Sequence, residues 1–403
     1  MRAKFSIAIA FAALFLAAPV QAEVSGGKIK IGVLTDLSGL YTDNTGLGSV
    51  LAAQMAVEDA GGKVGETPVE LISADHQNKA DVGAAIARRW YDTEQVDVIV
   101  DVPNSAVALA VQAIAREKNR IVIFSSPATS ELTGKACSPV GAHWTYDTYA
   151  LAQVVGRAVV ANGYKDWFFL TADYAFGHAL ETDTSTVVKS AGGKVVGNIR
   201  APANTQDYSS FLLQAQASKA QVIALATAGA DTQNAIKQAA EFGIVQSGQK
   251  LATLLLAINE VNALGLKATS GIMLASPFYW DLDEETRAFA KRFFARHKAM
   301  PSLYQAGVYS AVAHYLKAVK AAGTDSALPV MAKMRDIPIN DFMTKNGTLR
   351  IDGRVIRDMY LFEVKSPAES KAPWDYYKKI ATIPGGEAFR PLAGSPCPLV
   401  ANN

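Results

Sequence analysis

Two stretches of the chain share one pattern: VDVIVDVPNSAVALAVQAIAREK at residues 96–118 and AQVIALATAGADTQNAIKQAAEFG at residues 220–243. Each contains a short apolar strand, a turn of small residues and an amphipathic helix. In an open α/β sheet, ligands bind where a turn leaves the carboxyl end of a strand, because helix N-terminal N–H groups and small side chains leave room there. Two such turns predict two lobes that face a shared cleft.

The first stretch belongs to a regular alternation of strands and helices. Its spacing favours right-handed βαβ units and a mainly parallel sheet. The expected strands are 28–34, 68–74, 96–102 and 120–124, and the expected helices are 46–60, 79–91 and 106–118.

The second stretch lies in a similar series, which predicts a second sheet of the same architecture. We expect helices at 149–162, 177–191, 209–218 and 232–242, and strands at 166–171, 194–199, 221–226 and 251–257, with Asp207 placed to cap the helix at 209. A strand at 271–276, helices at 284–297 and 303–322, and extended segments at 348–351 and 358–365 follow. This late mixture predicts more than one crossing between the lobes.

The first 22 residues have the pattern of a secretory signal peptide. Arg2 and Lys4 precede an uncharged apolar run of 14 residues at 5–18, and Val20-Gln21-Ala22 forms a small-x-small cleavage site. The alternative, an uncleaved membrane anchor, needs an apolar run of about 20 residues. No cysteine lies at the cleavage site, so we expect export without a lipid anchor.

The composition of the remaining chain argues against several partners. Residues 1–22 carry two of the 39 basic residues and none of the 37 acidic ones, so the exported chain is balanced in charge. A balanced chain is a poor partner for nucleic acid or an acidic membrane. The two cysteines, Cys137 and Cys397, lie beside prolines, and in an exported protein we expect them to form one disulfide rather than two free thiols.

Motifs for chemistry are missing from the sequence. It contains no G-x-S-x-G elbow, Walker loop, H-E-x-x-H or C-x-x-C, and the five histidines are scattered. We therefore expect no metal, no cofactor and no enzymatic activity.

The turns of the first lobe carry more information. Asn104 and Ser105 follow one expected strand, and Ser125, Ser126, Ala128 and Thr129 follow the next. Hydroxyl and N–H groups from two neighbouring strand ends can bind a carboxylate without arginine, and each such hydrogen bond contributes about 1.5–3 kcal/mol. The alternative is that these side chains only cap helices.

In the second lobe, the corresponding turns offer aromatic surface and space. Tyr174 and Phe176 leave a strand and enter a helix, whereas Ala228 and Gly229 supply only backbone and room. Tyr279 lies near an expected crossing. Core packing is the alternative for each of the aromatic side chains.

Several of these segments together resemble the solute-binding proteins of ABC importers, of the branched-chain amino acid (leucine/isoleucine/valine) type. They are the signal peptide, KIKIGVLTDLSGLY at 28–41, the two polar turns followed by Glu131-Leu132-Thr133, and TADYAFG at 171–177. The resemblance covers almost the whole exported chain.

The resemblance implies a type I periplasmic binding fold with three hinge crossings. Lobe 1 would comprise 28–145 and 277–350, lobe 2 would comprise 146–276 and 351–385, and 386–403 would form a C-terminal tail. Its carboxylate-binding serine falls on Ser105, and the next turn supplies Ser126, Ala128 and Thr129.

Three positions depart from the family pattern. Phe176 and Ala228 replace tyrosines, and the acidic acceptor for an ammonium group falls near Asn259, with Glu260 only adjacent. An unpaired ammonium in a closed cleft is costly, so we predict a carboxylate ligand of the aromatic or aliphatic class, as in an aromatic-acid-binding subgroup.

The sequence thus predicts a periplasmic receptor, expected to be a monomer, that captures a small carboxylate and delivers it to membrane permease subunits. A periplasmic ligand sensor that presents its closed form to a signalling receptor stays open as an alternative. A periplasmic hydrolase is a third reading, which the missing motifs disfavour.

Overall fold

The structure, a computed structural model, describes residues 24–401, so the predicted signal peptide lies outside the described part. Its first sheet has the strand order β2-β3-β1-β4-β5-β6. Neighbouring strands pair in parallel except β2, which is antiparallel to β3. The strands are β1 (Ile29–Thr35), β2 (Lys63–Val64), β3 (Thr67–Asp75), β4 (Val98–Asp101), β5 (Ile121–Phe124) and β6 (Gly141–His143).

The second sheet is entirely parallel and has the order β10-β9-β7-β8. Its strands are β7 (Asp166–Ala172), β8 (Lys194–Ala201), β9 (Val222–Ala226) and β10 (Lys250–Thr253). In both sheets the first parallel strand lies between the second and the third. This order places a topological switch point, where ligands bind in open α/β sheets, between β1 and β4 and between β7 and β9.

The first sheet is buried on both faces because successive strand residues point to opposite sides. Ile31 and Val98 pack in the cluster that contains residues of α1 and α12, whereas Leu34 and Ile99 pack in the cluster that contains residues of α2 and α3. The helices of this half are α1 (Gly46–Asp59), α2 (Ala80–Asp92), α3 (Ser105–Lys118), α11 (Glu284–His297), α12 (Leu303–Ala322) and α13 (Ala327–Asp336).

The second half adds its own helices and a small antiparallel sheet, β11-β14-β15. The longer helices are α6 (Ala175–Ser190), α7 (Ser209–Ala217), α8 (Ala230–Glu241) and α9 (Ile258–Leu264). The shorter ones are α4 (Thr148–Leu151), α5 (Arg157–Ala161), α10 (Leu266–Thr269) and α14 (Gly385–Ala388), with a π-helical segment at Ala152–Gly156. The first half also contains 3-10 turns at Ser25–Gly27 and Ser130–Thr133, and α15 (Pro398–Ala401) follows Cys397. The remaining strands are β11 (Met273–Ser276), β12 (Thr348–Leu349), β13 (Val355–Ile356), β14 (Met359–Val364) and β15 (Tyr377–Ile383).

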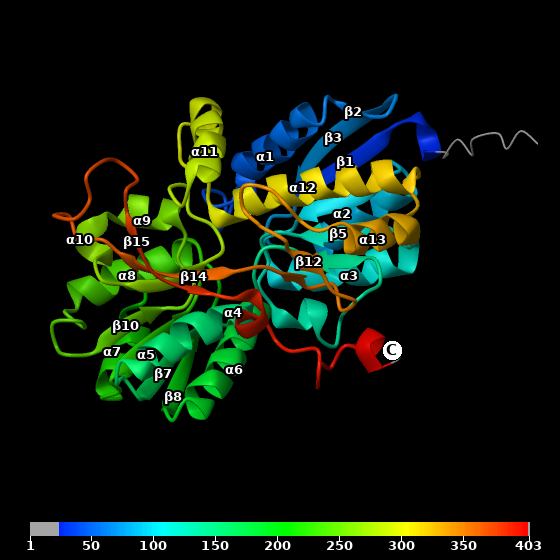
Figure 1. Cartoon of the computed structure of the whole chain (residues 1–403). Coiled ribbons are helices and arrows are strands. Elements are labelled where there is room, and N and C mark those ends of the chain that lie inside the picture. Colours follow the sequence, from blue (N-terminus) through cyan, green and yellow to red (C-terminus); the bar gives the residue numbers. More distant parts are fainter. Residues whose placement is uncertain (1–23, 402–403) are drawn as a thin grey trace, which may run out of the picture.

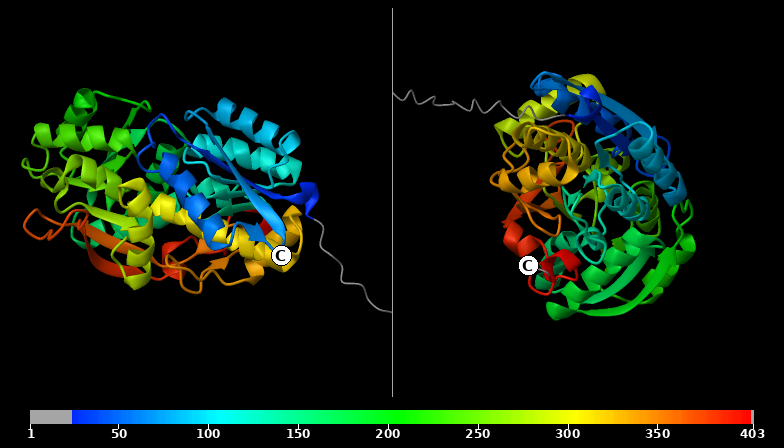
Figure 2. Two further views of the ribbon diagram at one scale, coloured as in Figure 1. Left: turned by 90° about the horizontal axis from the view of Figure 1, so that it is seen from above. Right: turned by 90° about the vertical axis from the view of Figure 1, so that its right-hand side faces the viewer.

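Figure 1 shows the two halves side by side, with blue and cyan elements in one and green elements in the other. The chain passes between them near residues 144–148, 277–283 and 350–358. Figure 2 shows the same division from two further directions. The C-terminal segment then returns from β15 toward the first half, where Cys397 is bonded to Cys137, which confirms the predicted disulfide.

Most predicted elements are present, and the differences are local. The strand expected at 251–257 was wrong in its second half, because β10 ends at Thr253 and the following residues turn toward α9. The sequence analysis did not identify the short strands β2 and β6, the helices α9 and α13, or β15. Asp207 lies one residue before the N-cap residue of α7, which is Tyr208, and its carboxylate accepts a hydrogen bond from the first helical N–H, that of Ser209, at 2.9 Å.

Candidate functional site

A small cavity lies where the carboxyl ends of β1, β4 and β5 face those of β7, β9 and β10. It holds about 10 Å³ of space for the centre of a water-sized sphere, which is room for about one water molecule. The two halves are therefore closed on each other. The cavity is lined by Tyr41, Thr45, Pro103, Ser126, Ala128, Tyr146, Phe176, Ala228, Leu255 and Tyr304.

The loop after β1 positions Tyr41. The buried Asp36 carboxylate accepts hydrogen bonds from Gly39 N and Tyr41 N, both at 2.8 Å, and from Asn78 Nδ2 at 2.6 Å. Hydrogen bonds to a carboxylate are stronger than neutral ones, so this loop is held in one conformation. Burial, followed by the nearby Tyr174 phenol, raises the pKa of Tyr41, which stays a neutral phenol.

The end of β4 has an unusual backbone. Asp101 and Val102 adopt left-handed conformations, with φ of 83° and 56°. A β-branched residue is rarely found there, and such strain concentrates at functional sites. The Asp101 carboxylate accepts a hydrogen bond from the Ser126 hydroxyl, and burial raises its pKa to about 6. Two neighbouring strand ends are thereby joined.

Two further tyrosines line the cavity from the first half and from the crossing at 144–148. The Tyr146 hydroxyl donates to Ser126 O at 2.8 Å, and its ring lies 5.8 Å from that of Tyr304, centroid to centroid. The sequence analysis did not select Tyr41, Tyr146 or Tyr304. Both Tyr146 and Tyr304 are distant in sequence from the polar turns that were selected, so no local pattern would have identified them.

The second half contributes a wall with little polar character. Phe176, Ala228 and Leu255 line the cavity, and the ring of Tyr174 lies 5.9 Å from that of Phe176. The hydroxyls of Tyr174 and Tyr41 contact each other across the boundary between the halves. The departures at Phe176 and Ala228 therefore lie on the cavity surface.

A backbone contact closes the halves beside this pair. Leu40 O accepts a hydrogen bond from Ala230 N at 3.2 Å. Gly229 has φ of 62°, and a Cβ atom there would lie 2.4 Å from Leu40 O. Glycine at this position is thus required by the backbone conformation and by the close approach.

The polar turns of the first lobe reach the cavity through Ser126 and Ala128 only. Asn104 caps α3, with Oδ1 accepting from Ala106 N and Val107 N at 2.9 and 3.2 Å. The Ser105 hydroxyl accepts from Thr129 N at 3.3 Å. In this closed conformation the capping alternative describes Asn104 and also Thr129, whose Oγ1 accepts from Glu131 N at the start of the 3-10 turn Ser130–Thr133, while the Ser105 hydroxyl bonds to the neighbouring turn.

Three other predicted residues lie outside the lining of the cavity. The Ser125 hydroxyl and Asn259 Oδ1 are buried without a hydrogen-bond partner. Tyr279 lines a separate small cavity, and its hydroxyl donates to Trp374 O at 3.2 Å. Tyr279 therefore packs at the base of the second half and does not face Tyr41.

Glu260 lies close to the cleft, with only 1% of its surface exposed. Its Oε2 accepts from Ala257 N at 2.5 Å, and its Oε1 has no partner. Burial raises the pKa of this carboxyl to about 8, while the Gly229 backbone and the Asn44 side chain lower it. Glu260 is therefore mostly neutral near pH 7. Its neighbours include Asn44 of the first half and Gly229 of the second.

A larger groove of about 480 Å³ lies on the outside, between α6, the turn at Ser130–Thr133 and the C-terminal tail. His178, at its edge, lies 2.8 Å from Asp173. Within residues 24–401 no group of three or more His, Cys, Asp or Glu side chains is arranged to hold a metal ion. The same part of the chain contains no helix of the length and apolarity that crossing a membrane requires.

Comparison with known proteins places this geometry in a family. The family model described as periplasmic binding protein matches residues 28–371. A periplasmic binding protein from Burkholderia mallei is 52% identical, with a TM-score of 0.91, over 93% of this chain and 99% of that one.

Two further solved structures are similar. One is a branched-chain amino acid ABC transporter periplasmic ligand-binding protein from Burkholderia xenovorans. It is 42% identical, with a TM-score of 0.83, over 93% of this chain and 100% of that one. A solute-binding protein of an ABC transporter from R. palustris, in complex with benzoate, is 22% identical, with a TM-score of 0.80 over 88% and 96% of the two chains. At 22% identity, the similarity to the R. palustris protein shows a shared fold only.

These findings confirm the family that the sequence resembles and its two-lobed α/β fold. The family consists of solute-binding proteins of transporters, and it implies a periplasmic location. This chain belongs to the periplasmic binding protein family and is of the branched-chain amino acid ABC transporter type.

Proposed function

We propose that this chain is the receptor of an ABC importer, which encloses a small carboxylated molecule between its lobes and delivers it to the membrane permease. The observation that carries the proposal is the cavity at the two switch points, whose wall combines residues of both halves. A ligand contacts both walls together only when the lobes are closed, so binding and closure are linked. In this proposal lobe 1 comprises residues 28–145 and 277–350, and lobe 2 comprises residues 146–276 and 351–385.

The wall of the cavity favours a ligand with an aromatic or aliphatic body. The rings of Tyr41, Tyr146, Phe176 and Tyr304 line it, and none of its lining residues is charged. Aromatic walls stabilise an apolar group through buried area and ring contacts. The Ser126 and Thr45 hydroxyls and the phenols are the polar groups that can bond to a carboxylate.

Because the cavity now has room for about one water molecule, a ligand must displace contacts that the closed halves make with each other. One such contact is that between the hydroxyls of Tyr41 and Tyr174. Both phenols are buried and neutral, so each can donate a hydrogen bond to a ligand oxygen when the pair separates.

Glu260 bears on whether the ligand carries an amine. A carboxyl group with a pKa of about 8 is mostly protonated near pH 7, so it is not a fixed negative charge. Binding an ammonium group would require Glu260 to lose its proton, whereas an acid without an amine leaves it neutral. We therefore infer an aromatic or aliphatic carboxylate without an α-amino group.

The experiment compares matched pairs of ligands that differ only in the amine. We expect 4-methylpentanoate to raise the melting temperature of the purified protein more than leucine does, and 3-phenylpropanoate more than phenylalanine does. Benzoate is added as an aromatic acid outside the pairs. At a ligand concentration 100 times Kd, binding stabilises the fold by about 2.7 kcal/mol. Tighter calorimetric binding of leucine than of 4-methylpentanoate would refute the ligand class.

Delivery to the permease requires a test in cells. Uptake of the best ligand, labelled isotopically, should fall to background when the gene for this chain is deleted and should return when it is restored. Unchanged uptake, together with tight binding in vitro, would favour the sensing alternative over transport.

A further inference from the structure

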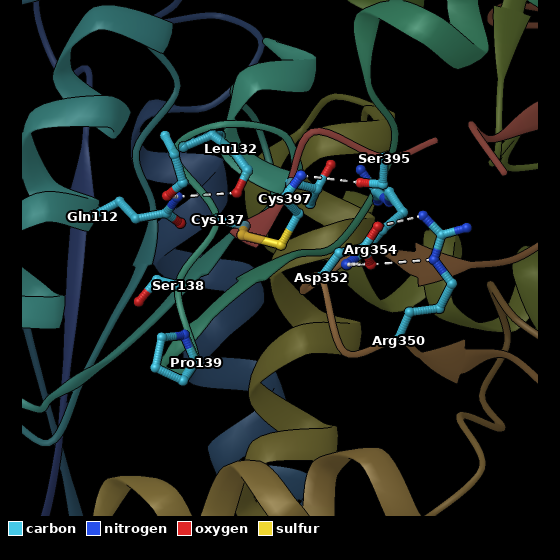
Figure 3. Close-up of a disulfide and its surroundings, with 12 residues drawn as sticks. Gln112, Leu132, Cys137, Ser138, Pro139, Arg350, Asp352, Arg354, Ser395 and Cys397 are labelled. Carbon is cyan, nitrogen blue, oxygen red and sulfur yellow. Dashed lines mark hydrogen bonds and ion pairs between the residues drawn. A yellow bond between two sulfur atoms is a disulfide. The ribbon is translucent and has the colours of Figure 1, made fainter. Parts of the chain in front are cut away.

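The C-terminal tail ends on the opposite half of the molecule from the strand that precedes it. β15 pairs with β14 in the small antiparallel sheet of the second half. Cys397, which is 1% exposed, is bonded to Cys137 of the first half, and the two lie 260 residues apart in sequence. Figure 3 shows this bond beside the segment that carries Arg350, Asp352 and Arg354.

Between these ends the tail buries Ala388 and Phe389 at the hinge, whereas most residues from Pro391 to Pro396 are exposed. The Phe389 side chain is 1% exposed, and the Arg354 guanidinium lies over its ring at 4.7 Å from the centroid. Arg354 in turn donates to Tyr146 O at 2.7 Å and lies 3.6 Å from Asp147. Phe389 therefore rests on the residue that joins the crossing at 144–148 to the crossing at 350–358.

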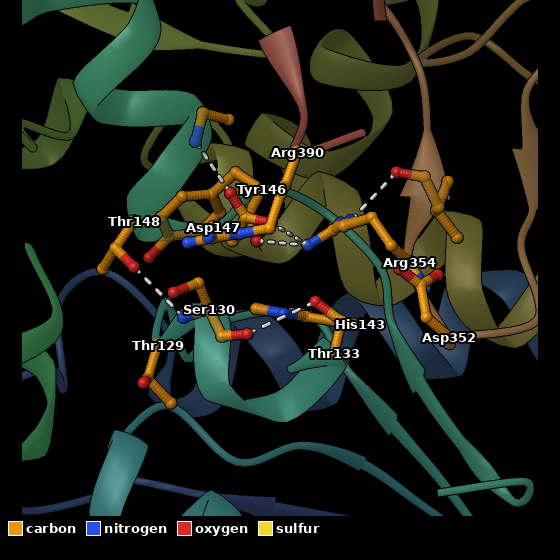
Figure 4. Close-up of polar contacts among 12 residues, drawn as sticks. Thr129, Ser130, Thr133, His143, Tyr146, Asp147, Thr148, Asp352, Arg354 and Arg390 are labelled. Atoms are coloured by element: carbon orange, nitrogen blue, oxygen red, sulfur yellow. Dashed lines mark hydrogen bonds and ion pairs between the residues drawn. The ribbon is translucent and has the colours of Figure 1, made fainter. Parts of the chain in front are cut away.

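The next residue ties the tail to the second half. Arg390 Nη2 donates to Asp183 Oδ1 at 2.9 Å, and its guanidinium lies over the Tyr149 ring. The other oxygen of Asp183 accepts from Ser130 Oγ at 2.8 Å and from Thr148 Oγ1 at 2.6 Å. Figure 4 shows Arg390, Thr148 and Ser130 converging at this place. One carboxylate of α6 thus joins the tail, a crossing and the first half.

From these contacts we infer that residues Phe389–Cys397, the hinge clasp, are a further connection between the lobes that restricts how far they open. This clasp acts on the hinge and does not depend on which ligand is bound. It adds to the three crossings a fourth link, anchored by Arg390 on the second half and by the disulfide on the first.

Both anchors are needed. The segment from Arg390 to Cys397 could extend over about 25 Å if its docked residues were released, so the disulfide alone would leave the lobes free to open. The disulfide keeps Phe389 and Arg390 at a high effective concentration beside their partners. The docked side chains then restrict the hinge.

The test measures lobe separation without any ligand. Labels are attached to cysteines introduced at Leu47 of α1 and Leu213 of α7, which are 70% and 52% exposed. The described chain has no free cysteine, so only the introduced thiols react, and their thioether bonds survive reduction of the disulfide. Pulsed electron paramagnetic resonance gives the distance distribution in the oxidised and reduced protein.

We expect reduction, or the double variant C137S/C397S, to shift the distribution to longer distances and broaden it. Arg390→Gln keeps the disulfide and should produce a shift in the same direction. Arg89→Gln removes an exposed ion pair between Arg89 of α2 and Glu94, at the same N–O distance of 2.9 Å but away from the hinge, and should produce none.

An unchanged distribution after reduction, with cleavage of the bond verified by mass spectrometry, would overturn the inference. So would an equal shift in Arg89→Gln. If the reduced protein loses its circular dichroism signal, Arg390→Gln alone decides the question, because it leaves the covalent bond intact.

Discussion

The carbonyl oxygen of Leu40 accepts a hydrogen bond from the backbone N–H of Ala230, so the two halves meet backbone to backbone beside the cavity. This contact leaves no room for a side chain at Gly229, whose Cβ would lie 2.4 Å from Leu40 O. At this point the contact between the halves therefore depends on the main chain of both.

Gly229→Ala should weaken ligand binding at least tenfold. The added methyl group obstructs the contact with Leu40, and the positive φ adds strain of about 1–3 kcal/mol. Gly163→Ala is the matched control, because Gly163 also has a positive φ, of 93°, but a Cβ atom there would have no neighbouring atom within 4 Å. It should lower stability and leave Kd unchanged in calorimetry; equal losses of affinity would contradict the prediction.

The pair formed by Tyr41 and Tyr174 can be tested with a double-mutant cycle. Removing one hydroxyl leaves the other buried without its partner, which costs about 1–3 kcal/mol. Tyr174→Phe and Tyr41→Phe should each destabilise the closed form, whereas the double variant should recover part of the loss. Tyr309→Phe, which removes a hydroxyl bonded to Asp59 outside the cleft, serves as control. Strictly additive effects on Kd would show that the hydroxyls act independently.

Glu260 should make stability depend on pH. Its pKa is about 8 in the folded protein, against an unfolded value near 4.5. Between these values the folded state holds a proton that the unfolded state has released, so this group lowers the free energy of unfolding as pH rises from about 4.5 to 8. Glu260→Gln should remove that decline.

Chemical denaturation at pH 5 and pH 8 measures this effect. The free energy of unfolding of Glu260→Gln minus that of the unsubstituted protein should be more positive at pH 8 than at pH 5. Parallel pH profiles of the two proteins would mean that Glu260 titrates normally. An acid ligand without an amine should bind Glu260→Gln and the unsubstituted protein with the same affinity. A ligand with an amine should bind more weakly to Glu260→Gln.

Asn104 and Ser126 separate capping from binding. Asn104→Ala removes the cap of α3 and should lower the free energy of unfolding by about 1 kcal/mol without changing Kd. Ser126→Ala removes a hydroxyl on the cavity wall and should weaken binding of a carboxylate. The two changes are compared by denaturation and calorimetry, and a loss of affinity in Asn104→Ala would assign the ligand role to both residues.

The sequence was sufficient for the alternating strands and helices, because apolar periodicity directly reflects burial on a two-faced sheet. Of the residues that the sequence predicts for the site, Ser126, Ala128, Phe176 and Ala228 line the cavity, and all four lie just after strand ends. It could not supply Tyr146 and Tyr304, because a residue of a crossing and a residue of α12 enter the cleft only through the path of the chain between the halves.

The position of Glu260 shows a second limit. The strand expected to reach residue 257 ends at Thr253, and α9 begins at Ile258. Because a helix turns 100° per residue, the direction of a side chain near its start depends on where that helix begins. The sequence could therefore place a carboxyl beside the expected acceptor position without showing that it is buried against the cleft.

The two walls of the cavity differ in how they are held, and this difference bears on how ligand range can change. In the first half, Tyr41 and Ser126 depend on the buried carboxylates of Asp36 and Asp101, and replacing one member of such a network leaves another unsatisfied. Phe176 and Ala228 mostly pack against apolar neighbours, where substitutions that conserve volume are tolerated. The second wall can therefore diversify among relatives, or in a laboratory library, while the first is kept.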